Sequence, residues 1–300
     1  MLFLVFALLA VLLLLAAGLY LALQVVRPKC FSVEETYRIE IETGRMDEAE
    51  WLSWEKQEVI IRSPFGYDLF GIYLPLAHSK NTVIIAHGIT YTLFGSVKYV
   101  NLFRKRGYNI LLYDHRNHGK SGGRWSTIGY FEKYDLAAWL AWERERIRNS
   151  GQVGVMGESY GAATAIQCLA ETQGADFLIC DSCFSELTDL LAYHLELDYQ
   201  LPPFPFLRLA SIWSKLLTGM AFEDISPLRD IGKITIPCLF THGKGDKFTP
   251  ARMSEALYAA KTQGIRALYL VQNADHAEAF FIDPQAYEAQ VAAFLNMSGR

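Results

Sequence analysis

The sequence predicts an α/β fold with a mostly parallel sheet covered by helices on both faces. Short apolar runs that suit buried strands alternate with longer helical segments along most of the 300-residue chain. Two segments stand outside this alternation. Residues 1–26 form a long apolar run, and residues 184–226 lie between two predicted strands without containing one. We therefore predict one large α/β domain with an N-terminal membrane anchor and a helical insertion.

The N-terminal segment MLFLVFALLAVLLLLAAGLYLAL has no charged residue before Arg27. About 20 apolar residues suffice to cross a bilayer, so residues 1–26 are predicted to form a transmembrane helix. A cleaved signal peptide would have a basic n-region and a shorter apolar core, and a buried core helix would show a second, polar face. Arg27 and Lys29 follow the segment, so the positive-inside rule predicts a single-pass membrane protein whose C-terminal body is cytoplasmic.

The cysteine content bears on the redox state of the thiols, and the charge content bears on the expected partners. The five cysteines include no CxxC pair, and Cys168, Cys180 and Cys238 lie in apolar runs typical of a core, so we expect reduced thiols. The net charge is −4 and no basic tract stands out, so nucleic acid is not expected as a partner.

Residues 27–56 contain interspersed charged and aromatic residues and are predicted to form a helical or irregular neck that leads to the domain. The predicted domain, residues 57–300, begins with two strands in EVIIRSPFGYDLFGIYLP, separated by a Ser-Pro-Phe-Gly turn and suited to an antiparallel edge. Further strands are predicted at 82–88, 109–114, 152–156, 176–182, 236–243 and 265–271. Helices are predicted at 95–107, 129–147, 160–170, 254–261 and 284–296.

The insertion at 184–226 is rich in Leu, Phe, Tyr and Trp and has a proline-rich break at PPFP. Such a segment can be a set of helices that only pack on the domain. An apolar helical insertion between sheet strands is also typical of a lid over a binding site, and we favour this interpretation.

The stretch Gly157-Glu158-Ser159-Tyr160-Gly161 lies between an apolar strand and a helix of small residues. In a strand–turn–helix of this kind, glycines leave room where the neighbouring backbone would clash with a side chain, and the serine is raised to the end of the sheet. Ser159 is therefore a candidate nucleophile. The alternative is that Ser159 only caps the helix.

An acid and a base follow in the order that such a serine requires. Asp246 lies in THGKGDKFTP directly after the strand 236–243, and His276 lies in ADHAEAF directly after the strand 265–271. We therefore predict Ser159, His276 and Asp246 as nucleophile, general base and orienting acid.

The same chemistry needs two N–H donors for a developing oxyanion. We predict the backbone N–H groups of Tyr160, at the helix N-terminus, and of Ile89, in the loop after the strand 82–88. His87 and Gly88 are expected to shape that loop.

Other polar residues near strand ends have simpler interpretations. Asp181 is the second candidate for the acid, whereas His242 is expected to cap or pack its loop and Asp275 to bond to backbone. Asp114 and His118 are expected to organise their own loop, and His78 and His194 have no predicted role. His87, His115 and His118 lack the spacing of a metal site, so no metal is predicted.

Five stretches together resemble the α/β-hydrolase superfamily: TVIIAHGIT, GYNILLYDHRNHGKSGG, GVMGESYGAATA, IPCLFTHGKGDKFTP and NADHAEAF. They are most similar to bacterial membrane-anchored serine hydrolases of the Bem46-like and serine-aminopeptidase-like kind. The resemblance covers roughly residues 57–297 and implies an eight-stranded sheet, the Ser159–His276–Asp246 triad and no cofactor. Asn117 stands where the family usually has glycine, in a loop that is structural in the family.

The resulting functional hypothesis is a serine hydrolase that cleaves carboxylic esters with an apolar acyl or aryl group through an acyl-enzyme. The membrane anchor makes a lipid-derived small-molecule substrate a reasonable expectation. A thioesterase and an aminopeptidase share this chemistry and remain alternatives. From another class, the alternative is a non-catalytic, membrane-tethered binding scaffold.

Overall fold

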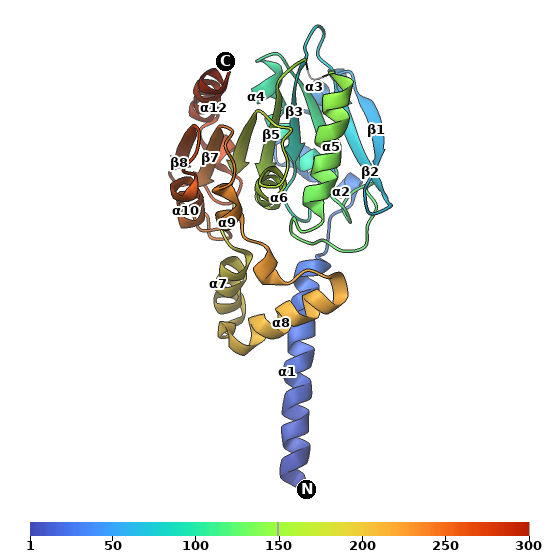
Figure 1. Cartoon of the computed structure of the whole chain (residues 1–300), viewed down its shortest axis with the longest axis vertical. Coiled ribbons are helices and arrows are strands. Elements are labelled where there is room, and N and C mark those ends of the chain that lie inside the picture. Colours follow the sequence, from blue (N-terminus) through green and yellow to red (C-terminus); the bar gives the residue numbers. More distant parts are fainter. Residues whose placement is uncertain (149, 300) are drawn as a thin grey trace.

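The computed structural model describes residues 1–148 and 150–299. It has three parts (Figure 1): a sheet with helices on both faces, a pair of helices beneath it, and a long N-terminal helix that projects away from the body. The N-terminus lies at the far end of that helix, and the C-terminus lies on the opposite side of the body.

The sheet has eight strands in the order β1-β2-β4-β3-β5-β6-β7-β8. β1 pairs antiparallel with β2, β2 pairs antiparallel with β4, and all the other pairs are parallel. The strands are β1 (Gln57–Arg62), β2 (Asp68–Leu74), β3 (Asn81–Ala86), β4 (Tyr108–Tyr113), β5 (Val153–Glu158), β6 (Phe177–Asp181), β7 (Cys238–Gly243) and β8 (Arg266–Val271). The predicted fold class, a mostly parallel sheet with an antiparallel edge, is confirmed.

Each face of the sheet carries its own hydrophobic core, because side chains alternate along a strand. In β3, for example, Ile84 faces one core and Val83 the other. The first core is covered by α5 (Glu132–Arg146), α6 (Tyr160–Leu169), α9 (Pro227–Ile231) and α10 (Arg252–Ala260). The second is covered by the 3₁₀ helix η1 (Leu93–Tyr99), α4 (Val100–Arg104), α11 (Ala279–Ile282) and α12 (Pro284–Ser298).

The segment predicted as a neck folds onto the second core. It forms α2 (Val33–Glu42) and α3 (Glu48–Ser53), and Trp51 of α3 is 4% exposed, with its ring 5.3 Å from that of Phe94. A capping box of Ser32 and Glu35 starts α2. The predicted boundary at residue 57 therefore marks no break in the packing.

The predicted amphipathic helix 95–107 is mostly the 3₁₀ helix η1, and α4 is only a short continuation of it. Every residue of η1 is buried. The prediction assumed a solvent-exposed face, but α2 packs over η1 and removes that face.

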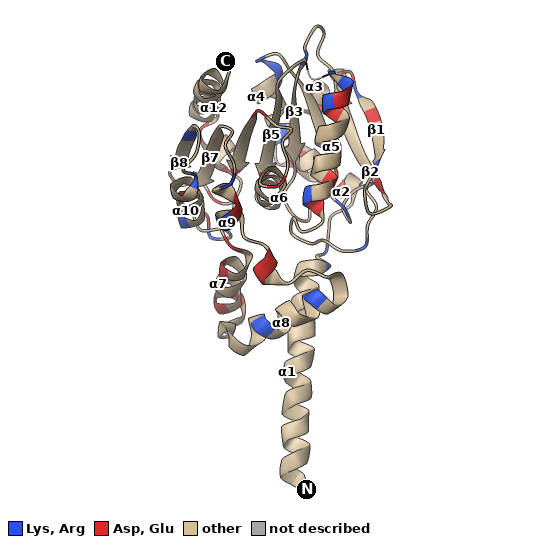
Figure 2. Ribbon diagram, viewed as in Figure 1, with Lys and Arg blue, Asp and Glu red and all other residues tan. Residues whose placement is uncertain are grey.

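Residues 184–226 contain no strand and form α7 (Leu187–Tyr199), α8 (Pro203–Thr218) and η2 (Phe222–Asp224). α7 and α8 lie beneath the sheet in Figure 1, and α8 packs against the body end of the projecting helix α1 (Leu2–Val26). Among the described residues, α1 alone is long and apolar enough to cross a membrane, and a signal sequence can have the same length and position. Figure 2 shows that α1 carries no charged side chain, that those of α7 are acidic and that those of α8 are basic.

Trp51 provides a test of how α3 packs on the second core. We expect Trp51→Ala to lower the free energy of unfolding by about 3–5 kcal/mol, because a large buried ring leaves a cavity. The matched control is its neighbour Leu52→Ala, whose side chain is 65% exposed and whose loss should change stability by about 0.5 kcal/mol or less. Chemical unfolding of the full chain in detergent measures both. Equal midpoints for the two variants would contradict the packing described here.

Candidate active site

Ser159 lies at the turn between β5 and α6 with φ 53° and ψ −112°, a left-handed conformation that only a tightly constrained backbone holds in a serine. The constraint comes from the neighbouring glycines. A Cβ on Gly157 would lie 2.4 Å from the backbone N of Ala162, and one on Gly161 would lie 2.1 Å from the carbonyl oxygen of Ala86. This close approach of α6 to β3 and β5 fixes Ser159 at the end of the sheet, as the sequence pattern predicted.

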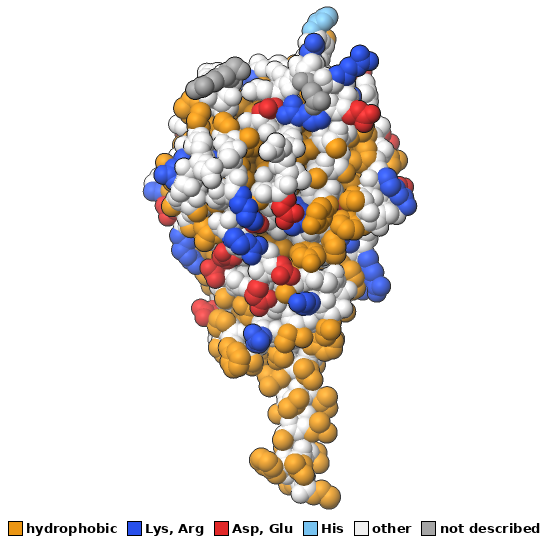
Figure 3. Space-filling model, in the orientation of Figure 1, with side chains coloured by type: hydrophobic (Ala, Val, Ile, Leu, Met, Phe, Trp, Pro, Cys, Tyr) orange, Lys and Arg blue, Asp and Glu red, His pale blue; other side chains and the backbone are white. Residues whose placement is uncertain are grey.

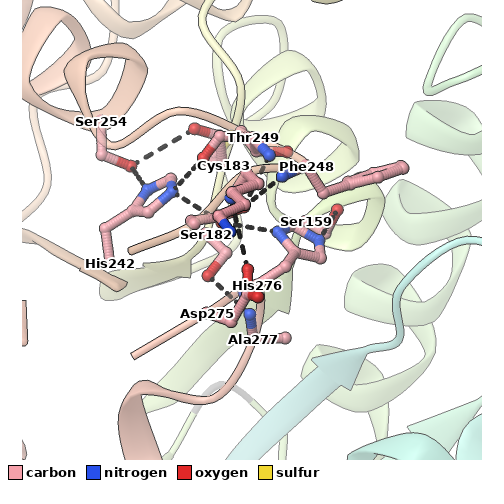
Figure 4. Close-up of polar contacts among 12 residues, drawn as sticks. Ser159, Ser182, Cys183, His242, Phe248, Thr249, Ser254, Asp275, His276 and Ala277 are labelled. Carbon is pink, nitrogen blue, oxygen red and sulfur yellow. Dashed lines mark hydrogen bonds and ion pairs between the residues drawn. The ribbon is translucent and has the colours of Figure 1, made fainter. Parts of the chain in front are cut away.

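The structure brings Ser159, His276 and Asp246 together in one hydrogen-bonded chain, although they lie after three different strands. Ser159 Oγ is 3.0 Å from His276 Nε2, and His276 Nδ1 is 2.7 Å from Asp246 Oδ2. Figure 4 shows Ser159 and His276 pointing toward each other. This arrangement lets Nδ1–H donate to the carboxylate, so that Nε2 is free to accept the serine proton.

Asp246 is held by more than His276. Its Oδ1 accepts the backbone N–H of Phe248 at 2.9 Å and of Thr249 at 2.7 Å, and its Oδ2 lies 3.0 Å from His242 Nε2. Burial by itself raises the pKa of Asp246, but the hydrogen bonds from His242 and His276 outweigh it and lower the pKa to about 2. Asp246 is therefore a permanent anion at neutral pH.

His242 has a larger part in the site than the sequence indicated. It is fully buried, and its Nδ1 lies 2.7 Å from Ser254 Oγ while its Nε2 faces both Asp246 and the carbonyl oxygen of Thr249. His242 therefore positions the acid as well as packing its loop. Its place at the end of a buried strand, four residues before Asp246, was the available signal.

The loop that carries His276 is fixed on both sides. Asp275 Oδ1 accepts the backbone N–H of His276 at 2.8 Å, which confirms its predicted bonding to backbone. Ala277 N–H donates to Ser182 Oγ at 3.1 Å. The ring of Phe248 lies 4.8 Å from the ring of His276 and covers it. These contacts hold the imidazole in one orientation.

Tyr160 and Ile89, whose backbone N–H groups are predicted to bind an oxyanion, line an apolar cavity together with Ser159. Within the described residues, the N–H groups of Tyr160 and Ile89 have no hydrogen-bond acceptor. The loop around Ile89 is held by its neighbour Thr90, whose N–H donates to His118 Nε2 and whose carbonyl accepts the N–H of Phe31. His118 thus supports this loop, beyond its predicted role in its own.

The remaining candidates lie elsewhere. Asp181, the second candidate for the acid, accepts hydrogen bonds from Tyr287 and Ser182 rather than from His276. Asp114 organises its own loop as predicted, because it accepts the N–H groups of Leu93 and Lys120. His78 is exposed.

A buried charged cluster lies behind the nucleophile. Lys98 Nζ is 2.5 Å from Glu158, and Tyr99 donates to Glu158 at 2.6 Å. Burial raises the pKa of Asp181 and, on α2, raises that of Glu40 to about 7. This cluster joins η1 and α2 to the ends of β5 and β6. Across residues 1–148 and 150–299, no group of three or more His, Cys, Asp or Glu side chains could hold a metal ion.

An apolar cavity of about 310 Å³ opens beside Ser159. Its walls come from the nucleophile turn, from the loop around Ile89, from α7 and α8, and from the end of α1. The α7 wall is tied to the acid loop, because Tyr193 donates to the carbonyl of Lys247 and His194 Nε2 donates to that of Phe248. The insertion 184–226 therefore forms part of the cavity wall beside Ser159, and His194 has a structural role that the sequence did not indicate.

An eight-stranded sheet of this order, with a serine raised on a strand–turn–helix at its end, defines an α/β-hydrolase. Within that superfamily the chain belongs to the family described as X-Pro dipeptidyl-peptidase (S15 family), which matches residues 22–196. The matched range includes Ser159 and ends before Asp246 and His276.

Individual relatives match most of the chain. The uncharacterized protein YqkD of Bacillus subtilis is 38% identical over 244 residues, which cover 81% of this chain and 80% of that protein. The uncharacterized protein YfhR of Escherichia coli is 24% identical over 238 residues, which cover 76% of this chain and 75% of that protein.

Solved structures show the same fold. The Pyrococcus furiosus esterase Pf2001 matches with a TM-score of 0.69 and 26% identity, covering 84% of this chain and 94% of its own. The acylaminoacyl peptidase of Pyrococcus horikoshii matches with a TM-score of 0.63 over 84% of this chain and 43% of its own, at 15% identity, and shows likeness of fold alone. The chain is thus a hydrolase of the α/β-hydrolase fold.

The lowered pKa of Asp246 predicts how stability depends on pH. A carboxyl whose pKa is about 2 in the folded chain and about 3.9 in the unfolded chain stabilises the fold by about 2–3 kcal/mol above pH 5. This contribution is lost as the pH falls through the folded pKa. We therefore expect the Tm advantage of the wild type over Asp246→Asn to be constant from pH 7 to about pH 5 and to shrink below about pH 4.

Thermal unfolding of the full chain in detergent, measured at each pH, checks this expectation. The control removes an exposed carboxylate, Glu145→Gln, which should follow the wild type throughout. A Tm difference between wild type and Asp246→Asn that does not change with pH would show that the carboxylate is not stabilised as described.

Proposed function

We propose that this protein is a serine esterase that cleaves carboxylic esters through an acyl-enzyme on Ser159. The observation that carries the proposal is the hydrogen-bonded chain from Ser159 through His276 to the buried anion of Asp246. The esterase named among the structural neighbours supports the same chemistry.

In the first half of the reaction, His276 Nε2 takes the hydroxyl proton of Ser159 while Oγ attacks the ester carbonyl carbon. The tetrahedral oxyanion is stabilised by the N–H groups of Tyr160 and Ile89. Asp246 stabilises the imidazolium that forms and keeps its tautomer fixed. Collapse of the intermediate breaks the ester C–O bond, and His276 returns the proton to the leaving alcohol.

In the second half, water replaces the alcohol. His276 accepts one proton from water as its oxygen attacks the acyl carbon, and a second tetrahedral intermediate forms on the same two N–H donors. Its collapse releases the carboxylic acid and restores the Ser159 hydroxyl. Substrate and water enter, acid and alcohol leave, and no other reactant is needed.

The cavity supports an apolar acyl group in preference to a peptide N-terminus. Leucine, isoleucine and phenylalanine side chains dominate its walls, and among the described lining residues Asp198 is the one carboxylate. Asp198 lies at the open rim of the cavity, where its side chain is 53% exposed and its Oδ2 is 2.9 Å from His194 Nδ1. A peptide amine would need an unpaired anion in this apolar space, because buried charges need partners.

A dipeptidyl-peptidase is the second candidate, because the family that matches residues 22–196 is described by that activity. Peptide and ester cleavage share the acyl-enzyme. The two candidates therefore differ in the leaving group and in what the cavity accepts.

A fluorescent fluorophosphonate tests the proposed nucleophile. We expect wild-type protein to be labelled, and Ser159→Ala and His276→Ala to lose labelling because the activated oxygen or its base is gone. Ester hydrolysis by both variants should fall by about a thousandfold or more. The full chain in detergent is required, because the end of α1 forms part of the cavity wall.

The matched control is Ser96→Ala, since Ser96 is also a buried serine and its hydroxyl has no partner within the described part of the chain. It should label like the wild type. Hydrolysis of p-nitrophenyl acetate, butyrate and octanoate, compared with that of Ala-Pro-p-nitroanilide, separates esterase from dipeptidyl-peptidase. Folded wild-type protein that neither labels nor cleaves any of the four compounds would favour the non-catalytic scaffold.

His242 gives a second prediction for the same reaction. His242→Phe keeps the buried ring volume but removes the hydrogen bond to Asp246, and a hydrogen bond to a charged group contributes about 1.5–3 kcal/mol. We expect kcat for p-nitrophenyl butyrate to fall about tenfold or more with KM unchanged. His242→Gln retains an N–H donor and should recover part of the rate. Equal kcat values for the wild type and His242→Phe would show that His242 only fills space.

A further inference from the structure

The end of α1 is built into the domain. Gly18, Ala22 and Val26 are buried, whereas every residue from 1 to 16 is exposed. The carbonyl of Val26 accepts the backbone N–H of Ser126. The last two turns of α1 are thus part of the hydrolase, whereas the first sixteen residues are exposed.

α8 packs directly on this part of α1. A Cβ on Gly18 would lie 2.6 Å from Leu209 Cβ, so the two helices approach closely at a position that only glycine allows. Trp213 of α8 donates its Nε1–H to the carbonyl of Leu15 at 3.0 Å. The cavity is bounded on one side by this contact, because Leu21 and Val25 of α1 and Leu207 and Ala210 of α8 all line it.

The outer face of α8 is apolar and basic. Phe204 and Leu216 are more than 70% exposed and Ile212 is 48% exposed, with Arg208 and Lys215 between them. A soluble protein rarely leaves such large side chains together in water. Basic residues beside exposed apolar ones are typical of a helix that lies in a membrane interface. In Figure 3 the orange apolar surface of the lower body continues onto the projecting helix.

Aromatic side chains lie beside α1 between residues 15 and 20. Tyr20 lies beside Tyr199, at the end of α7, and Trp213 contacts the carbonyl of Leu15. Tyr and Trp are enriched where membrane meets water. The exposed residues of α1, from Leu2 to Ala16, rise about 22 Å, which is most of the roughly 30 Å hydrocarbon thickness of a bilayer.

We propose that the bilayer crossed by α1 also covers the outer face of α8, and that the substrate's acyl chain enters the cavity from the bilayer between α1 and the helices α7 and α8. The inference rests on the proposed esterase function. It names the substrate class as a single-chain carboxylic ester dissolved in the membrane. The same cavity touches Ser159 at the reacting end and Leu21 and Tyr199 at the level of the aromatic residues, so one chain can reach from the lipid to the nucleophile.

The experiment uses the full chain in phosphatidylcholine vesicles and two probes. 4-Methylumbelliferyl oleate is dissolved in the vesicles, and p-nitrophenyl butyrate is added in water. The variant Ile212→Glu/Leu216→Glu places charge on the outer face of α8, outside the cavity wall. We expect it to lower oleate hydrolysis by about tenfold or more, because burying charge against lipid is costly, and to leave butyrate hydrolysis unchanged. The control Leu52→Glu/Ile282→Glu alters two equally exposed apolar residues elsewhere and should change neither rate.

The outcomes separate the two proposals. If the outer-face variant keeps both rates, membrane entry is wrong and the esterase proposal stands. If the wild type hydrolyses neither probe, the esterase proposal itself fails.

A second measurement does not depend on activity. In a Cys30→Ser background, which leaves four buried cysteines, Leu216→Cys and Leu52→Cys are each labelled with a nitrobenzoxadiazole dye. Phosphatidylcholine brominated on its acyl chain should quench the dye at position 216 and not at position 52. Absence of quenching at 216 would overturn the proposal, including in the case where the glutamate variant loses both activities by misfolding.

Discussion

The close approach of α6 to β3 and β5 is the constraint on which the rest of the site depends. Backbone atoms occupy the space that side chains at Gly157 and Gly161 would need. In this tight turn Ser159 adopts a positive φ. The turn fixes a point at the end of the sheet. Base and acid arrive on loops after β8 and β7, and parallel pairing of the strands sets the distance of those loops from that point.

Two layers of polar contacts hold this geometry. On the acid side, Asp246 receives hydrogen bonds from two backbone N–H groups and two imidazoles, so its charge is satisfied without water. Behind the nucleophile, the ion pair of Lys98 and Glu158 joins η1 to the end of β5. α2 brings Glu40 to the same buried region. Residues 27–56, predicted as a neck, therefore support the site from the side of the second core.

Local pattern was sufficient to predict the strands, most helices and the order of Ser159, Asp246 and His276, because each depends on residues near it in the chain. What it could not provide were contacts between distant segments. The charged and aromatic residues of segment 27–56 predicted a linker, because the sequence does not show that Trp51 packs into the second core. α1 is apolar on every side, so its sequence does not distinguish the turns that face the domain. His242 could be placed at a strand end, but its bond to Asp246 needed the folded loop.

The cavity wall joins the first helix of the chain to helices that lie nearly two hundred residues later. During synthesis, α1 is therefore complete long before α8 exists, and Ser159 leaves the ribosome well ahead of His276. A chain that has not yet made β8 has Ser159 without His276 and a sheet without its last strand. The order of synthesis thus makes the proposed active site one of the last features to form, after β8 has joined the sheet and α1 has packed against α8.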